Sequence, residues 1–187
     1  MNEIEIVKGC LKNDRASQKL LYDLYYSTML GICLRYSNSE EEANDILHDG
    51  FLKAYLGLKN FNNSASLEGW LRKIMVNTCI DYLRKGKQNY HIVSTVYADE
   101  NTKEIAEVID DDELIINIEK EDILRAVQKL TPAYRTVFNL YVMEDYSHKQ
   151  IADLLEISEG TSKSNLSKAK FNLRKNLTHL IQKPHDK

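Results

Sequence analysis

Three groups of side chains in this 187-residue sequence have types and spacings that could bind charged partners. Near the C-terminus, residues 160–183 hold six lysine or arginine side chains and no aspartate or glutamate. Lysines neutralise phosphates, and short polar side chains near the start of a helix can reach base edges in the major groove. The segment therefore predicts binding to duplex DNA rather than an ordinary solvated helix face.

This basic segment follows the start signals of two helices. Ser147 with Gln150 has the spacing of a capping box, and Ser158 or Thr161 can cap the helix after the short turn EISEG. Two helices joined by such a turn form a helix-turn-helix pattern. We expect the second helix to pack on the preceding one through Leu166, Ala169, Leu173, Leu177 and Leu180. The opposite face is expected to present Ser162, Lys163, Ser164, Ser167, Lys168 and Asn172.

The second group is acidic. Glu41, Asp45 and Asp49 are spaced by four, so their carboxylates share one helix face, with His48 beside them and Leu52 further along. Such acids repel each other mildly, which is tolerated if the face is solvated or meets a basic partner. An adjacent His-Asp pair could also belong to a metal-dependent hydrolase. Because the other histidines show no paired spacing, neither a metal nor a cofactor is expected.

The third group lies between residues 62 and 87. Lys73, Asn77, Asp81 and Arg84 form a polar stripe on an otherwise apolar helix, and Trp70, the single tryptophan, stands near its start. An aromatic ring beside cations and an Asn-rich loop suits unstacked single-stranded bases. Taken alone, Trp70 would fit an ordinary core position better than a DNA-binding one.

The composition indicates which elements position these groups. Glycine (7) and proline (2) are too scarce for a turn-rich β architecture, so we expect an all-α fold. Residues 90–126 hold 11 acidic and 3 basic side chains and predict an acidic linker between helical domains at 1–89 and 127–187. Three distant cysteines predict buried thiols in a reducing compartment. No signal sequence or membrane-spanning stretch is visible, so we expect a cytoplasmic protein without membrane insertion.

Several helices are expected from local pattern. Residues 16–36 form an amphipathic pattern with Leu20, Leu21, Leu24, Met29, Ile32 and Cys33 on its apolar face. Ser39 and Glu42 predict a second capping box. A long helix should run from 67 to near Gly86, and Thr131 with Pro132 should open another.

The three groups, in this order, resemble the extracytoplasmic-function (ECF) group of bacterial RNA polymerase sigma factors. Where family members read close to DAEDLVQETFLRAW, this chain has EANDILHDGFLKAY from Glu42 to Tyr55. WLYRIARNLAIDYLRR is matched by WLRKIMVNTCIDYLRK, and the helix-turn-helix segment is matched by LTPAYRTVFNLYVMEDYSHKQIADLLEISEGTSKSNLSKAK. The resemblance covers most of the chain: residues from about 20 to 87 are similar to the family's region 2, and residues from 130 to about 177 are similar to its region 4.

The resemblance implies a non-enzymatic initiation factor that binds core RNA polymerase, at the β′ clamp helices and the β flap, and promoter DNA. It implies polymerase docking through Glu41, Asp45, His48, Asp49 and Leu52. It implies minus-ten DNA binding through Asn62, Asn63, Ser64, Trp70, Lys73, Asn77 and Arg84. It implies minus-thirty-five binding through Thr161, Lys163, Ser164, Ser167, Lys168 and Lys170. An anti-sigma factor is expected as a further partner.

The chain also departs from the family pattern. His48 stands where Gln is usual, and Met75 and Val76 replace the usual Ala-Arg pair. In the last helix, Ser162, Asn165, Ser167 and Lys168 replace residues that are commonly Val, Arg, His and Arg. Because lysine does not reproduce the bidentate contacts of arginine, these changes affect the expected promoter sequence rather than the expected role.

The helix-turn-helix alone also resembles transcriptional regulators of the LuxR type. Such a regulator would carry an α/β receiver or ligand-binding domain in the first part of the chain. No pattern of Val- and Ile-rich strands bounded by glycine is present before Tyr90, which favours the sigma-factor interpretation.

Overall fold

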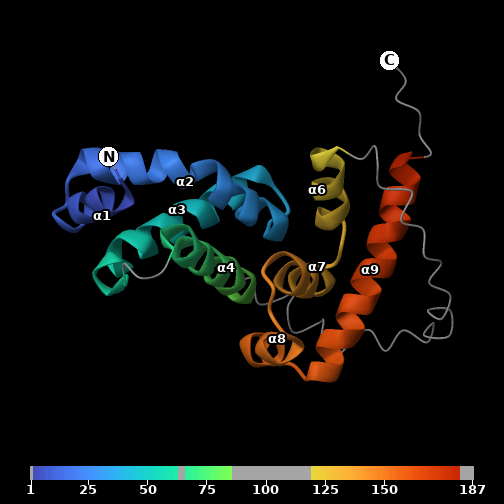
Figure 1. Ribbon diagram of the computed structural model, residues 1–187. Coiled ribbons are helices and arrows are strands. Elements are labelled where there is room, and N and C mark those ends of the chain that lie inside the picture. The colour runs from blue at the N-terminus through green and yellow to red at the C-terminus, as the bar shows by residue number, and fades with distance from the viewer. Residues whose placement is uncertain (1, 63–65, 86–118, 182–187) are drawn as a thin grey trace, which may run out of the picture. The chain divides into compact units, whose positions relative to one another are not determined.

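Every element of the computed structural model is a helix in the part that it describes, residues 2–62, 66–85 and 119–181 (Figure 1). The predicted all-α class is therefore confirmed. The chain divides into two compact units, Met1–Lys85 and Gly86–Lys187. Of the expected acidic linker, residues 90–118 lie outside the described residues, and its last residues belong to a helix of the second unit.

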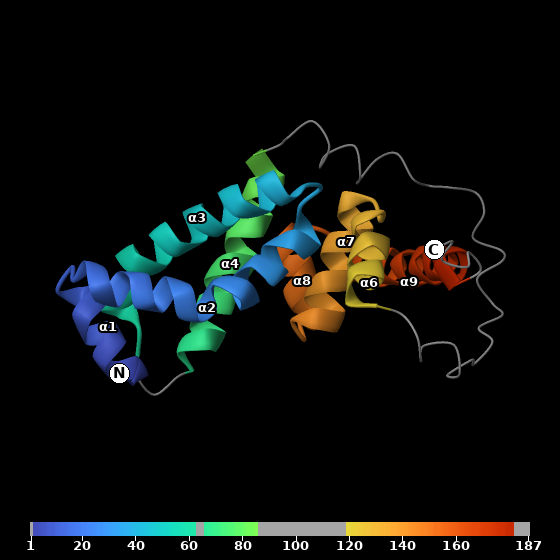
Figure 2. The same cartoon turned by 90° about the horizontal axis from the view of Figure 1, so that it is seen from above.

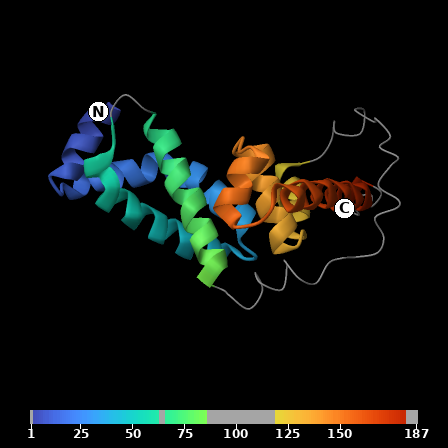
Figure 3. The ribbon, with the colours of Figure 1, turned by 90° about the horizontal axis from the view of Figure 1, so that it is seen from below.

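The first unit consists of α1 (Glu3–Leu11), α2 (Arg15–Tyr36), α3 (Glu40–Gly57), the short 3-10 helix η1 (Leu58–Asn60) and α4 (Leu67–Lys85). Three residues connect α2 to α3, and α3 returns alongside α2 in the opposite direction (Figure 2). Seen from the other side, α4 crosses the α2–α3 pair (Figure 3). The first unit is thus a small bundle in which α3 and α4 are direct neighbours.

Local capping explains where two of these helices begin. Asn2 and Glu5 form a capping box at α1, with reciprocal bonds of 2.9 and 3.0 Å. At α3, the Ser39 hydroxyl accepts the Glu42 N–H at 3.1 Å, as predicted. The predicted return bond was wrong, because the Glu42 carboxylate accepts the N–H of Asn38 at 2.8 Å instead. The two residues that precede α3, Asn38 and Ser39, therefore both hydrogen-bond to Glu42 in its first turn.

The core-facing side of α2 differs in part from the prediction. Leu21, Met29, Ile32 and Cys33 are buried as expected. The other two predicted core residues are wrong: Leu20 is 39% and Leu24 is 53% exposed. Residues four apart, Ser17, Leu21, Tyr25 and Met29, turn inward instead, because the i, i+4 row brings the large Tyr25 ring rather than Leu24 onto the core.

Gly50 allows α3 and α4 to approach closely. A Cβ added at Gly50 would lie only 2.9 Å from Met75 Cε and closer still to its sulfur. Met75 is fully buried, so its thioether fills the space that a larger residue at position 50 would need. The Gly50–Met75 pair therefore sets the distance between the two helices that carry the acidic and the basic groups of this unit.

The second unit contains α6 (Lys120–Gln128), α7 (Pro132–Phe138), the π-helical turn η3 (Asn139–Met143), α8 (His148–Leu155) and α9 (Glu159–Ile181). Figure 1 shows α6, α7 and α8 placed in turn along one side of α9. Leu166 and Ala169 of the predicted stripe are buried, and Leu173 and Leu177 are half-buried. The helix α9 packs on α6 and α7 as well as on the preceding helix α8, so it connects the other α-helices of this unit.

Three further features shape the second unit. The fully buried Arg135 donates through its guanidinium to the carbonyl of Gln128 at 3.1 Å, which satisfies the end of α6. The predicted capping box of α8 is confirmed, with bonds of 3.2 and 2.8 Å between Ser147 and Gln150. The turn before α9 uses Glu156 at a positive φ of 58°, whereas Gly160 of the expected turn is already inside α9.

Candidate functional site

The acidic group of the sequence forms a continuous exposed face on α3. The side chains of Glu41, Asp45, His48 and Asp49 are exposed, and Leu52 is 60% exposed. Leu56, one turn further on, is 77% exposed and was not predicted as part of this face. Its signal was available, because it continues the same spacing after Leu52. The result is an acidic surface that ends in two exposed leucines.

Aromatic rings and a phenol flank this acidic face. The His48 ring stacks on Tyr22 of α2, with centroids 6.5 Å apart and planes at 8°. The Tyr22 ring also packs against the rings of Phe51 and Tyr26, with centroid distances of 4.7 and 5.3 Å. On the other side, burial raises the pKa of the Tyr82 phenol, and the carboxylates of Glu42, Asp45 and Glu41 raise it further.

The polar stripe predicted on α4 lies on one face of that helix. Lys73 and Asn77 are exposed, and Arg84 is half-buried. The fourth member, Asp81, accepts an ion-pair hydrogen bond from Lys53 of α3 at 2.8 Å. Because α3 neutralises the one acid of the stripe, the charge that remains on this face of α4 is positive.

Trp70 lies at the start of the same stripe. Its ring packs on Phe61, with ring centroids 5.3 Å apart and planes at 51°. It also lies next to Gly57, where an added Cβ would be 3.4 Å from the indole ring. The side chain is half-buried, so it is neither a plain core residue nor fully solvated. Asn62 of the preceding loop is exposed, whereas the other two predicted loop residues, Asn63 and Ser64, lie outside the described residues.

The helix-turn-helix of the second unit is formed by α8, the turn 156–158 and α9. The Ser158 hydroxyl accepts the Thr161 N–H at 2.9 Å, so Ser158 is the cap of α9. Among the residues predicted to face DNA, Lys163, Ser164 and Lys170 are exposed, and Thr161, Ser167, Lys168 and Asn172 are half-buried. Of these, Ser164 and Lys168 lie on the side of α9 opposite the buried Leu166. Lys163 and Lys170 are three and four residues from Leu166, so they lie beside the packing face rather than opposite it.

One residue of the predicted DNA face was wrong. Ser162 is fully buried, and its hydroxyl lies 2.9 Å from Nδ1 of His148 on α8. The His148 ring stacks on Tyr141 of η3, with centroids 4.5 Å apart and planes at 25°. Ser162 is four residues before Leu166 and seven before Ala169, so the helical spacing places it on the packing face, where His148, 14 residues earlier, provides a partner for its hydroxyl.

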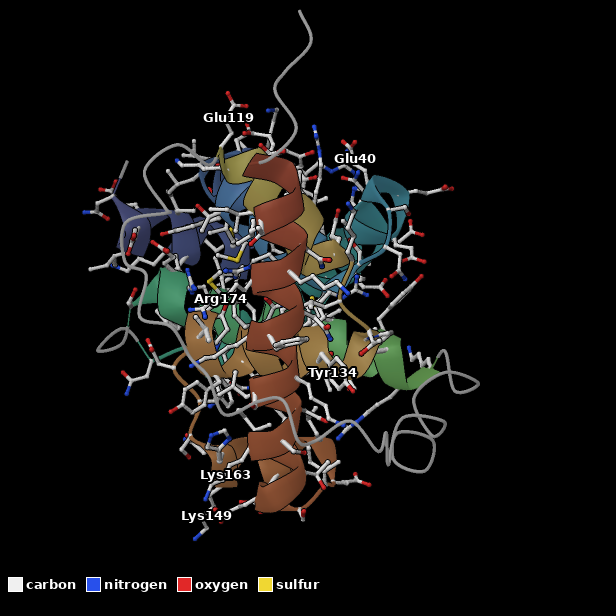
Figure 4. The ribbon with its side chains drawn as sticks, turned by 90° about the vertical axis from the view of Figure 1, so that its right-hand side faces the viewer. Glu40, Glu119, Tyr134, Lys149, Lys163 and Arg174 are labelled. Atoms are coloured by element: carbon white, nitrogen blue, oxygen red, sulfur yellow. The ribbon has the colours of Figure 1, made fainter. Side chains whose placement is uncertain are left out.

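The structure also adds a cation that the sequence interpretation missed. Lys149 is exposed in the first turn of α8. Figure 4 shows Lys149 and Lys163 projecting from the same end of the unit, where α8 meets α9, with Arg174 further along α9. The only sequence signal for Lys149 was its place just after the cap of the first helix of the helix-turn-helix.

The described residues also bear on the metal-dependent and membrane alternatives. No group of three or more His, Cys, Asp or Glu side chains in these parts of the chain is arranged to hold a metal ion. No helix among them is long and apolar enough to cross a membrane.

Known protein families match both units. The model "Sigma-70 region 2" matches residues 21–89, and "Sigma-70, region 4" matches residues 120–172. The region 2 match decides against the LuxR-type alternative, because it covers the part where that alternative needs an α/β domain. The second match begins at the first residue of α6.

Full-length relatives show the same relationship. The chain is 27% identical over 179 residues to the ECF RNA polymerase sigma factor SigW of Bacillus subtilis, covering 93% of this chain and 96% of SigW. It is 27% identical to the ECF sigma factor SigM of Mycobacterium tuberculosis (strain H37Rv), covering 96% of this chain and 86% of SigM.

A solved structure agrees in fold. The sigma factor RpoE of Bartonella quintana, solved with the anti-sigma factor NepR, superposes with a TM-score of 0.52 at 21% identity, covering 86% of this chain and 96% of that one. Both family models, the relatives and the all-helical architecture point the same way. The chain belongs to the extracytoplasmic-function group of RNA polymerase sigma factors, which direct promoter recognition and transcription initiation by that enzyme.

Proposed function

We propose that the two units divide promoter recognition between the surfaces described above. The α3 face binds core RNA polymerase, the α4 stripe holds the melted minus-ten strand, and α9 with the start of α8 binds the minus-thirty-five duplex. The protein acts in the cytoplasm, where it contributes binding surfaces and catalyses no reaction itself. The observation that supports this division best is the separation of charge, with exposed acids on α3 and exposed lysines on α4 and α9.

The α3 face suits a basic protein partner. Its carboxylates are exposed, and the exposed Leu52 and Leu56 provide an apolar contact beside them. Interfaces of this kind combine a desolvated apolar centre with complementary charges that steer association. The clamp helices of the β′ subunit are the partner that the family assigns to this face, and we propose the same partner here.

The α4 stripe suits single-stranded DNA. Lys73 and the half-buried Arg84 can neutralise backbone phosphates, and the Asn77 amide can hydrogen-bond a base edge. Trp70 provides a ring, supported by Phe61, on which a base can stack. Asp81 does not oppose this binding, because Lys53 pairs with it.

The end of the second unit suits duplex DNA. Lys149 at the N-terminus of α8 and Lys163 on α9 both project where α8 meets α9 (Figure 4). The N-terminus of α8 adds the partial positive charge of its dipole, which favours a phosphate. Ser164, exposed beside Lys163, can reach a base edge. We also propose that this unit contacts the β flap of the polymerase.

Regulation by an anti-sigma factor is part of the proposal. The sigma factor RpoE of Bartonella quintana was solved with the anti-sigma factor NepR, and its fold is similar to that of this chain. We propose that a protein of this functional class covers surfaces of this chain when it is inactive. A pull-down with a tagged anti-sigma candidate tests this: we expect it to recover this chain without RNA polymerase, because the two partners would bind the chain in separate complexes.

The proposal is tested by run-off transcription with bacterial core polymerase on a promoter library. We expect initiation that depends on this chain and that selects a common minus-ten and minus-thirty-five sequence. Core enzyme without the chain is the control. If the chain neither bound core polymerase nor supported initiation, the proposed function would be wrong.

Lys163 and Lys149 give a first quantitative prediction. Replacing either by alanine should weaken holoenzyme binding to promoter DNA nearly uniformly across sequences, and should reduce the slope of log K against log salt by about 1. Filter binding at several salt concentrations measures this slope. The matched control is Lys120, exposed at the start of α6, the helix that lies along the other end of α9 from α8 (Figure 1). An unchanged slope in the Lys163→Ala protein would contradict the assignment.

Trp70 gives a second prediction, for strand opening. Trp70→Ala should weaken the open complex by about 1–2 kcal/mol, the value of stacking one base on an aromatic ring. Trp70→Phe should retain much of this stacking. Open complexes are measured by permanganate reactivity of unpaired thymines, and binding to core polymerase serves as the control for folding. Loss of closed-complex binding to the same extent would assign Trp70 to packing instead.

A further inference from the structure

The start of the DNA-facing helix α9 is tied to two other elements through one hydroxyl. Ser162 lies in the first turn of α9 and is fully buried, and a buried hydroxyl is costly unless it is hydrogen-bonded. Its side-chain partner is Nδ1 of His148 at 2.9 Å. A polar link thus lies among the buried apolar side chains of this unit, between the two helices of the helix-turn-helix.

The His148 ring is itself held on two sides. His148 is the first residue of α8, directly after Ser147, whose capping box with Gln150 fixes the backbone there. On its face, the imidazole stacks on Tyr141 at 4.5 Å. The ring therefore connects η3, α8 and α9, and its Nδ1 is held in place for Ser162.

The apolar contacts of α9 cannot provide the same constraint. Burial of Leu166 and Ala169 holds α9 against its neighbours, but the hydrophobic effect has no direction and permits small rotations of the helix about its axis. A hydrogen bond has a direction as well as a distance. Ser162 lies between Thr161 and Lys163, so fixing its rotation also fixes the side chains that face DNA.

We propose that His148 is a positioning residue for promoter recognition: its hydrogen bond to Ser162, with the ring held by Tyr141, sets the rotation of α9 and so selects which α9 side chains meet the minus-thirty-five base pairs. This inference rests on the proposed role of α9 in DNA binding. Base recognition needs its groups held within about 0.5 Å, which is the scale of a small helix rotation.

The test compares variants that remove the bond in two ways. His148→Phe retains a ring for Tyr141 but has no Nδ1, and Ser162→Ala removes the hydroxyl. Each full-length variant is combined with core polymerase and transcribed on promoters randomised in the minus-thirty-five element. We expect each variant to reduce the preference for the best sequence over the others by about three- to tenfold, as the loss of one partly buried hydrogen bond predicts. The double variant should be no worse than either single one, because both remove the same bond.

Two further variants separate positioning from stability. His148→Asn places an amide where Nδ1 lies and should restore most of the preference. Thr136→Val removes another buried hydroxyl, which bonds only within α7 to the carbonyl of Pro132 at 2.7 Å. It should lower the melting temperature of the protein without changing the sequence preference.

The outcomes are distinguishable. If wild-type holoenzyme showed no dependence on the minus-thirty-five element, the proposed role of α9 would fail, and the inference with it. If wild-type showed that dependence but His148→Phe and Ser162→Ala kept the same sequence preference, the inference alone would be overturned. Additive losses in the double variant would also overturn it, since the two residues would then act separately.

Discussion

Replacing Asp49 by arginine is expected to weaken binding to core RNA polymerase by about 30-fold, or roughly 2 kcal/mol, without unfolding the protein. Asp49 is exposed in the middle of α3, away from both helix ends, so the reversal removes no cap and no favourable dipole interaction. On the proposed docking face, the new cation would meet a basic partner. Like charges that face each other across an interface cost several kcal/mol when they are partly desolvated.

The matched control is Asp23→Arg. Asp23 is exposed on α2 and pairs with Lys19 one turn earlier, outside the α3 face. The same charge reversal there should change core binding by less than about twofold, as is usual for an exposed pair. Binding is measured by fluorescence anisotropy with labelled sigma factor. Normal binding by Asp49→Arg would show that the polymerase docks on another surface.

Gly50→Thr is expected to destabilise the first unit by about 2 kcal/mol. A Cβ at this position would lie 2.9 Å from Met75 Cε, and Met75 is fully buried, so its thioether cannot move without displacing other core atoms. Overpacking of this kind typically costs 1–3 kcal/mol. Urea unfolding followed by the fluorescence of Trp70 reports on this unit alone, because the chain contains one tryptophan.

Two variants test the cause of that loss. Gly31→Thr introduces the same side chain in the interior of α2, where an added Cβ meets nothing within 4 Å, and should be close to neutral. Met75→Ala opens a cavity and should cost about 2–4 kcal/mol alone. Combined with Gly50→Thr, it should cost clearly less than the sum, because each change compensates the other. Simple additivity would contradict the packing argument.

The elements that depend on neighbouring residues could be predicted from the sequence. Ser147 with Gln150, Ser158 before α9 and Pro132 at the start of α7 mark helix starts, because a cap is decided within four residues. The exposed faces of α3 and α9 followed from spacing in the same way. These local signals were sufficient to place the acidic group on an exposed face of α3 and most of the basic group on exposed positions of α9.

Features that depend on distant partners could not be predicted. Leu24 and Tyr25 are equally suited to a core, and only the packing of α2 against its neighbours decides that Tyr25 is buried. Ser162 has the spacing of the buried stripe, but a serine there needs a polar partner, and that partner is His148 of another helix. The positive φ of Glu156 could not be predicted either, because Gly160 in the same segment is the residue type that usually adopts this conformation. Tertiary contacts override local preference at each of these positions.

The distribution of cysteine has a practical consequence for experiments on this sigma factor. All three thiols, Cys10, Cys33 and Cys79, belong to the first unit, and each is buried there. Burial raises the pKa of the Cys10 thiol, which lowers its thiolate fraction further. A thiol reagent can therefore label the native chain only when the first unit opens. The rate of alkylation, measured by mass spectrometry, therefore reports the opening of the first unit, both in the free protein and in the protein bound to polymerase. The second unit has no cysteine and does not contribute to this signal.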